Sequence, residues 1–83
     1  MNESKEIGQR IRKAREFRVL GTLECAELIG TDYTLLSRWE HGHTKPRPKS
    51  LKKIADVLNV DVNWLANGTK EFEEFIKVKG DLK

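Results

Sequence analysis

Two short segments with helical periodicity, separated by one glycine, constrain this chain more than any other feature of its sequence. The first segment has apolar residues at the spacing of one helix face, namely Leu23, Cys25, Ala26 and Ile29. Gly30 follows at the position where a helix commonly ends in a left-handed residue. The pattern predicts a helix that stops abruptly and a tight turn after it.

A second helix is expected between Asp32 and Gly42. The Asp32 carboxylate can accept hydrogen bonds from the free N–H groups of the first turn, and it favours the positive end of the helix dipole. Leu36 and Trp39 form the apolar face of this helix. Two short amphipathic helices joined by a tight turn are typical of a helix-turn-helix.

The polar face of this second helix predicts contacts with DNA. It consists of residues at i, i+1, i+4, i+5 and i+8, namely Tyr33, Thr34, Ser37, Arg38 and His41. Because such side chains suit a major groove, we predict that the first four of them contact bases. Arg38 is the strongest candidate, since a guanidinium can donate two parallel hydrogen bonds to guanine O6 and N7.

Arg38 and Tyr33 each keep a second interpretation. Arg38 could contact a phosphate instead, or pair within its helix with Asp32 or Glu40. Tyr33 could stack against a sugar or a thymine methyl group, or it could simply cover the junction between the two helices. The sequence leaves these alternatives open.

Positive charge is concentrated just after this face. The net charge is only +3, but residues 38–53 contain six basic side chains and one acidic side chain. The loop 41–49 combines cations, a hydroxyl group and two stiffening prolines. We predict phosphate contacts from this loop and from the start of the first helix of the motif, namely from Thr22, His41, His43, Thr44, Lys45, Arg47 and Lys49. The alternative is a solvated loop; a metal site is not expected, because two histidines without further ligands are a weak signal.

The rest of the chain predicts an all-α domain. Beside the two helices above, we expect helices at about residues 4–19, 48–58 and 62–67. Their apolar positions are Ile7, Ile11, Ala14 and Phe17 in the first, Leu51, Ile54, Ala55 and Leu58 in the second, and Val62, Trp64 and Leu65 in the third. A chain of 83 residues has room for one small core, so residues 1–68 are predicted to form one domain.

Residues 69–83 are predicted to form a C-terminal tail outside this domain. Phe72, Phe75 and Ile76 fit a helical stripe, whereas alternation of Ile76 and Val78 with lysines fits a strand. Either form could serve dimerisation. The competing interpretation is a linker.

Two further features receive a structural interpretation. A second basic run lies on the first predicted helix, and most of it is expected to be a solvated face; it comprises Arg10, Arg12, Lys13, Arg15 and Arg18. Cys25 is the sole cysteine of the chain and cannot form an internal disulfide. Its place on an apolar helix face predicts a buried, inert thiol.

Several motifs in order resemble the Cro and lambda-repressor-like helix-turn-helix proteins. They are IGQRIRKARE, AELIGTDYTLLSRWEHGHTKPRP and LKKIADVLNVDVNWLANGT, which span roughly residues 7–69. The resemblance implies a compact five-helix domain, built around a helix-turn-helix of helices 2 and 3, that binds operator DNA as a two-fold dimer. It also implies a partly buried ion pair between Arg15 and Glu40. The chain departs from the family at Gly21-Thr22, where members commonly have Thr-Gln, so a usual phosphate-binding side chain is missing.

Together these observations predict a sequence-specific transcriptional regulator of double-stranded DNA. We expect a phage- or prophage-type repressor that binds a palindromic operator as a homodimer, located in the cytoplasm on the nucleoid. The alternative is a protein-interaction module of the same fold, such as an antitoxin or a repressor partner. No nucleophile-base pair, phosphate-binding glycine loop or metal cluster is evident, so no enzymatic activity, cofactor, metal, membrane or small-molecule ligand is expected.

Overall fold

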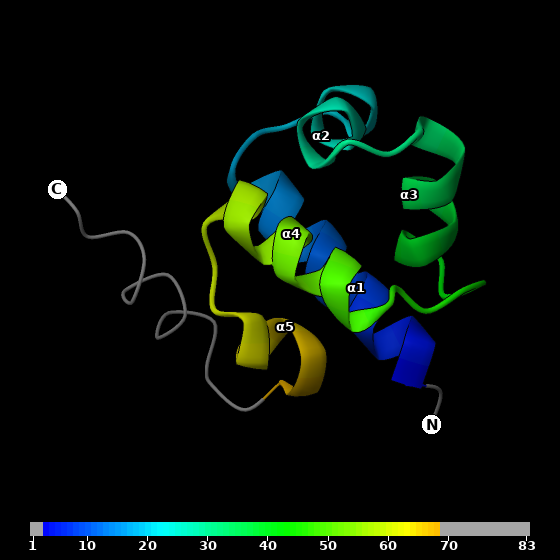
Figure 1. The fold of residues 1–83 in the computed structure, drawn as a ribbon, viewed down its shortest axis with the longest axis vertical. Coiled ribbons are helices and arrows are strands. Elements are labelled where there is room, and N and C mark those ends of the chain that lie inside the picture. The colour runs from blue at the N-terminus through cyan, green and yellow to red at the C-terminus, as the bar shows by residue number, and fades with distance from the viewer. Residues whose placement is uncertain (1–2, 69–83) are drawn as a thin grey trace, which may run out of the picture.

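The computed structural model describes residues 3–68, and five helices make up its regular structure in that range (Figure 1). The helices are α1 (Glu3–Phe17), α2 (Thr22–Ile29), α3 (Tyr33–Glu40), α4 (Pro48–Leu58) and α5 (Val62–Asn67). This confirms the predicted all-α, five-helix fold. The predicted tail of residues 69–83 lies outside the described residues.

The helix ends follow the predicted capping chemistry. Gly30 adopts a left-handed conformation with φ of 90° and donates its N–H to the carbonyl groups that end α2. Asp32 accepts a hydrogen bond of 2.7 Å from the N–H of Leu35 at the start of α3. Asn59 ends α4 in the left-handed region. The turn after α2 is therefore set by local chemistry alone.

α1 ends at Phe17, two residues earlier than predicted. Val19 has a φ of 58°, which an α-helix cannot accommodate, and its N–H donates to the Glu16 carbonyl at 2.9 Å. Left-handed backbone is uncommon for a β-branched residue, and nothing in the composition of this segment indicates it. The early stop directs the chain toward α2.

The core lies where α1 packs against α3, α4 and α5 and where α2 packs against α3 and α4, and Figure 1 shows α1 running beside α4 through the centre of the molecule. Its buried apolar residues are Ile7, Ile11, Ala14, Cys25, Ala26, Ile29, Leu36, Trp39, Leu51, Ile54, Ala55, Leu58, Val60, Trp64 and Leu65. Most of these residues were predicted from helical spacing. The agreement indicates that amphipathic patterning determines the packing of this small domain.

Three predicted apolar positions are instead exposed. Phe17, Leu23 and Val62 expose 43%, 60% and 38% of their surface. In α1 the buried spacing continues from Ala14 to position 18, so Arg18 takes the inward place and Phe17 turns outward. Leu23 lies on the flank of α2 away from its buried residues. Simple periodicity therefore overestimated the width of the apolar faces of all three helices.

Gly8 allows α3 to approach α1 closely. A Cβ atom at this position would meet the carbonyl oxygen of Glu40 at 2.7 Å and would also clash with that of Trp39. Only a residue without a side chain fits between the two backbones. The end of α3 is consequently packed directly against α1.

Arg10 of α1 and Arg18, the residue directly after α1, bind the ends of other helices, contrary to the expectation of a solvated basic face. Arg10 donates to the carbonyl oxygens of Leu65 and Ala66 in α5, at 2.9 and 3.1 Å. Arg18 donates to those of Leu58 and Asn59 at the end of α4, at 2.7 and 2.9 Å. Carbonyl groups at a helix C-terminus lack partners within the helix and carry its negative dipole end, so both contacts are favourable.

Candidate nucleic-acid interface

An ion pair between Arg15 and Glu40 fastens α3 to α1. The Nε and Nη2 atoms of Arg15 donate to the two carboxylate oxygens of Glu40 at 2.6 and 3.0 Å. The third guanidinium nitrogen, Nη1, donates to the Leu20 carbonyl at 2.8 Å. Both side chains are largely buried, with 11% and 5% of their surfaces exposed, and the hydrogen bond that Arg15 donates to Glu40 raises the pKa of Arg15. The pair therefore fixes the position of α3 before any ligand binds.

The outer face of α3 carries the side chains that the sequence assigns to base contacts. Tyr33, Thr34 and Arg38 are exposed, and Ser37 is half-buried. Within residues 3–68 the Arg38 guanidinium has no hydrogen bond or ion pair. The predicted alternative of an intrahelical pair is wrong, because Glu40 is bound to Arg15 and Asp32 caps α3 without contacting Arg38.

His41 stands at the end of this face in a defined orientation. Its Nδ1 atom lies 2.8 Å from the Ser37 carbonyl oxygen, which can only accept, so this nitrogen is the donor. The ring stacks against that of His43 with 6.1 Å between centroids. The Nε2 atom is left as the nitrogen able to meet a ligand.

The loop after α3 presents several cations and one inward hydroxyl group. His43, Lys45, Arg47 and Lys49 are exposed, while Pro46 is buried and anchors the loop. The Nζ atom of Lys45 lies 3.1 Å from a Glu3 carboxylate oxygen, in a pair that solvent reaches on both sides. The Thr44 hydroxyl group is buried, and it has no hydrogen-bond partner among residues 3–68. Thr44 therefore does not present the hydroxyl that the sequence assigns to a phosphate contact, because the fold turns it inward.

Six of the predicted contact residues line two separate hollows of the surface. Thr22, Tyr33, Ser37 and His41 line a polar hollow of about 160 Å³ between α1, α2 and α3. Lys45 and Arg47 instead border a groove of about 510 Å³ between the start of α1, the loop, the start of α4 and α5. The structure thus brings four predicted residues together and places two elsewhere.

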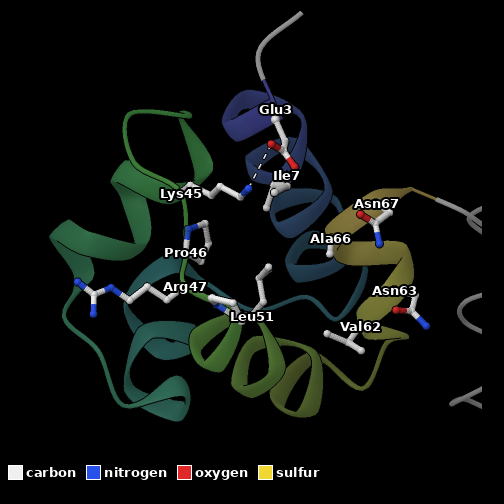
Figure 2. A pocket seen from close by; sticks show the side chains of 11 residues that line it. Glu3, Ile7, Lys45, Pro46, Arg47, Leu51, Val62, Asn63, Ala66 and Asn67 are labelled. Carbon is white, nitrogen blue, oxygen red and sulfur yellow. Dashed lines mark ion pairs between the residues drawn. The ribbon is translucent and has the colours of Figure 1, made fainter.

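Figure 2 shows the second of these hollows, which is mainly apolar. Side chains from four elements converge on it, including Ile7, Pro46, Leu51, Val62 and Ala66. The Lys45–Glu3 pair crosses one end of the groove, and two asparagines border the other. This surface has the character of a contact site for apolar groups and not for a charged backbone.

Cys25 shows no sign of chemical function. The residue is fully buried, and burial raises the pKa of its thiol to about 11. A thiol with so high a pKa is a poor nucleophile. Among residues 3–68 there is also no group of three or more potential metal ligands, and no helix there has the length and apolar character needed to cross a membrane.

Sequence reasoning missed the structural roles of Arg10 in α1 and of Arg18 directly after it. Arg10 and Arg18 bind carbonyl groups that lie 55 and 40 residues further along the chain, and no local pattern identifies those partners. One signal was available for Arg18, since it continues the spacing of the buried positions 7, 11 and 14. A cation at an apolar phase of a helix indicates a buried partner.

Comparison with known proteins agrees with this architecture. The sequence profile of a family described as a helix-turn-helix domain matches residues 8–71. A control-region protein of 10 kDa from the immF region of Bacillus phage phi105 is 35% identical over 65 residues, which is 78% of this chain and 72% of that protein.

Solved structures show the same fold. SinR of Bacillus subtilis, the master regulator for biofilm formation, solved in complex with DNA, is 37% identical with a TM-score of 0.68 over 71% of this chain and 95% of its own. The c2 repressor of phage P22, in complex with a synthetic operator, is 24% identical with a TM-score of 0.71 over 75% of this chain and 94% of its own. At that identity the repressor supports the fold alone.

The relatives of this chain are helix-turn-helix transcription regulators and not enzymes, in agreement with the exposed polar face of α3. A fixed α3 with free polar side chains is what binding of a DNA duplex requires. The chain belongs to the Cro and lambda-repressor-like family of helix-turn-helix proteins, and it is a DNA-binding transcriptional regulator.

Proposed function

We propose that this protein is a repressor of the phage or prophage type that binds a palindromic operator as a homodimer, with α3 in the major groove. The observation that carries the proposal is the contrast within α3. Its inner side is fixed to α1 through Arg15 and Glu40, whereas Arg38 on its outer side has no partner within the described part of the chain. A rigid helix with a free guanidinium suits direct readout of guanine.

The named relatives support a DNA partner. The phi105 protein comes from a phage control region, and the SinR structure contains DNA. We transfer only the type of partner to this chain, because its recognition side chains must be considered separately. Tyr33, Thr34, Ser37 and Arg38 are the proposed base contacts, and Thr22, His41, His43, Lys45, Arg47 and Lys49 are the proposed phosphate contacts.

A homodimer would give two copies of α3 a fixed spacing. Half-sites about 34 Å apart, one turn of DNA, would then present the same edge of the duplex to both copies. Two linked contacts raise the apparent affinity well above that of one. Repression is the simplest regulatory outcome, since a bound dimer at a promoter excludes polymerase by occupancy.

Selection of bound DNA from a random duplex pool tests the proposal. We expect a palindromic consensus from the wild type. With Arg38→Ala at the same salt concentration, preference should relax at one symmetric position, with a loss of roughly 1–3 kcal/mol of discrimination per half-site. Unchanged preference with weaker binding would assign Arg38 to phosphate, and no enriched sequence would contradict the proposal.

The apolar groove of Figure 2 favours a second candidate function, a protein-interaction module. Apolar side chains such as Leu51 and Val62 line it, and Val62 is more exposed than a core residue would be. The salt dependence of complex formation separates the two functions. DNA binding should weaken with a log-log slope near −0.9 per neutralised phosphate, whereas an apolar contact should change little.

A further inference from the structure

We propose that the apolar groove of Figure 2 is covered by the C-terminal segment of the same chain, residues 69–83, through Phe72 and Phe75. The inference goes beyond the proposed function, because it concerns a surface away from the outer face of α3 and needs no DNA. It assigns an occupant to the groove, so a protein partner that used this surface would first have to displace the segment.

The groove has an apolar floor and a partly open rim. Ile7 and Leu51 are almost fully buried, with 1% and 6% of their surfaces exposed, whereas Val62 exposes 38%. Figure 2 shows Ile7, Leu51 and Ala66 converging on the groove from α1, α4 and α5. Its volume of about 510 Å³ corresponds to about 17 water molecules of roughly 30 Å³ each. The groove therefore has room for more than one large apolar side chain.

The chain leaves α5 at the edge of this groove. Asn67, the last residue of α5, borders the groove, and Gly68 follows in the left-handed region with φ of 67°. A Cβ atom at Gly68 would lie 2.9 Å from Nη1 of Arg10, so the backbone runs closely against α1 at this point. Arg10 lies one helical turn from Ile7 of the groove. The C-terminal segment therefore begins beside the surface that it is proposed to cover.

The segment carries aromatic rings that the core lacks. Two of the three phenylalanines of the chain, Phe72 and Phe75, lie in residues 69–83. The third, Phe17, exposes 43% of its surface, so the core of residues 3–68 contains no phenylalanine. One turn of helix would place Phe72, Phe75 and Ile76 on the same side of the segment. Such rings bury a large apolar area, and the groove offers an apolar surface next to them.

Charge is also complementary between the segment and the groove. Residues 71–75, with the sequence Glu-Phe-Glu-Glu-Phe, contain three carboxylates and no cation. Arg10 lies at the exit from α5, and Lys45 borders the groove from the loop before α4. Lys45 is paired with Glu3, but 48% and 63% of these side chains are exposed, so exchange for a glutamate of the segment costs little.

Attachment at Gly68 favours the groove of the same chain over that of a second copy. Four residue steps separate Gly68 from Phe72 and span about 13 Å when extended, slightly more than the roughly 10–12 Å diameter of one helix. The first ring can therefore reach past the end of α5. A short connection of this kind gives the segment an effective concentration on the order of millimolar, far above that of a second copy in a dilute solution.

The test uses the full chain with a nitroxide attached to a cysteine introduced by Lys77→Cys. Lys77 follows Ile76 but lies off the apolar positions of the segment, so the label does not replace a side chain that enters the groove. Cys25 stays unlabelled, because its thiol is buried and has a pKa of about 11. We expect docking to broaden the backbone amide resonances of Leu51 and Val62, while those of α2 keep their width.

The matched control carries Phe72→Ser and Phe75→Ser in the same labelled chain. Its length and charge are unchanged, so only the apolar contact is lost. Loss of each buried ring should lower the ratio of docked to undocked segment roughly tenfold or more, and the broadening at Leu51 should fall accordingly. Without the label, the same two changes should shift the amide resonances of Leu51 and Ala66 and leave those of α2 and α3 in place. Val62→Ser, which trims the rim of the groove, should also reduce the broadening.

Two results would overturn the inference. Equal broadening with and without the two phenylalanines would show that the connection alone brings the label near the groove. The second result comes from a mixture of isotope-labelled protein without nitroxide and nitroxide-labelled protein at natural isotope abundance. Broadening at the groove in this mixture would show that the segment of a second copy docks there instead. None of these samples contains DNA, so the outcome is independent of whether the protein binds an operator.

Discussion

α1 and the segment from Arg38 to Lys49 are both rich in basic residues, yet the structure uses these residues differently. Arg10 and Arg15 of α1, and Arg18 directly after it, donate to carbonyl or carboxylate groups of other helices. Arg38 and Lys49, in contrast, are exposed and have no partner within residues 3–68. This comparison shows that a cluster of basic residues in a sequence does not by itself locate a DNA-binding surface.

The partner of each cation explains its role. A guanidinium that already satisfies buried acceptors cannot neutralise a phosphate without leaving those acceptors unpaired. A cation without a protein partner releases counterions when it meets DNA and costs the fold nothing. We therefore expect stability and DNA binding to separate between the two regions when single residues are changed.

The largest effect is expected for Arg15→Ala. The change leaves Glu40 charged and buried, so the free energy of unfolding should fall by about 3–5 kcal/mol. Urea denaturation followed by circular dichroism measures this loss. Arg12→Ala, which breaks an exposed pair on the same helix, is the matched control and should cost under about 1 kcal/mol. Equal losses for both variants would contradict the assignment of Arg15 to the scaffold.

Arg38→Ala should give the opposite pattern. Its guanidinium has no hydrogen bond or ion pair among the described residues, so the urea midpoint should not move. Discrimination between the preferred base pair and the alternatives should fall by roughly 1–3 kcal/mol. Competition binding with duplexes that differ at one position measures the change. A destabilised Arg38→Ala variant would remove the distinction between the two regions.

For Arg18→Ala we expect an intermediate loss of stability, smaller than that of Arg15→Ala. Two carbonyl groups at the end of α4 lose a charged donor, but solvent can replace part of the interaction, so we expect a loss of about 1–2 kcal/mol of stability. Titration with DNA well below the melting temperature should give wild-type affinity. Weaker binding by the folded variant would show that α1 also contacts DNA through Arg18.

Arg47→Ala and Lys49→Ala should act through phosphates. Each should weaken binding to specific and unrelated duplexes alike and reduce the salt slope by about 0.9, while the fold stays intact. Fluorescence anisotropy over a salt series provides the measurement. A change in base preference would instead place these residues in a groove.

The smallest effect is expected for Cys25, whose thiol reactivity indicates whether the core opens. Its thiol has a pKa of about 11 in the folded protein, above its ordinary value of 9.0, because burial disfavours the thiolate. This contribution to stability is fully present below pH 9.0 and is lost as the pH rises toward 11. At pH 8 iodoacetamide should therefore react slowly with the folded wild type and rapidly in urea. Rapid alkylation without denaturant would indicate that the core opens.

Much of this fold follows from local sequence signals. Gly30, Asp32 and Asn59 end or begin helices by chemistry that acts over a few residues, and helical spacing identified most of the core. The early end of α1 at Phe17 was missed, because the left-handed Val19 has no composition signal. Local rules therefore predict helix identity better than helix length.

The candidate DNA-binding site could be predicted from the sequence where it depends on the residues of one helix. The polar face of α3 follows from its own periodicity, and it is indeed exposed. The hollow beside it combines residues of α1, α2 and α3, so no local pattern contains it. The inward hydroxyl of Thr44 and the carbonyl partners of Arg10 are further results of tertiary packing. The roles of basic residues could not be assigned until their distant partners were known.

We propose that DNA contacts the outer face of α3 and the loop after it. The most direct test is a titration of isotope-labelled protein with the selected duplex, followed through backbone amide resonances. We predict that the largest shifts occur at Thr22, residues 33–38 and residues 41–49, with little change at Asn63 and Ala66 beside the apolar groove. Shifts concentrated at the groove, with the Arg38 resonance unchanged, would contradict DNA binding through α3.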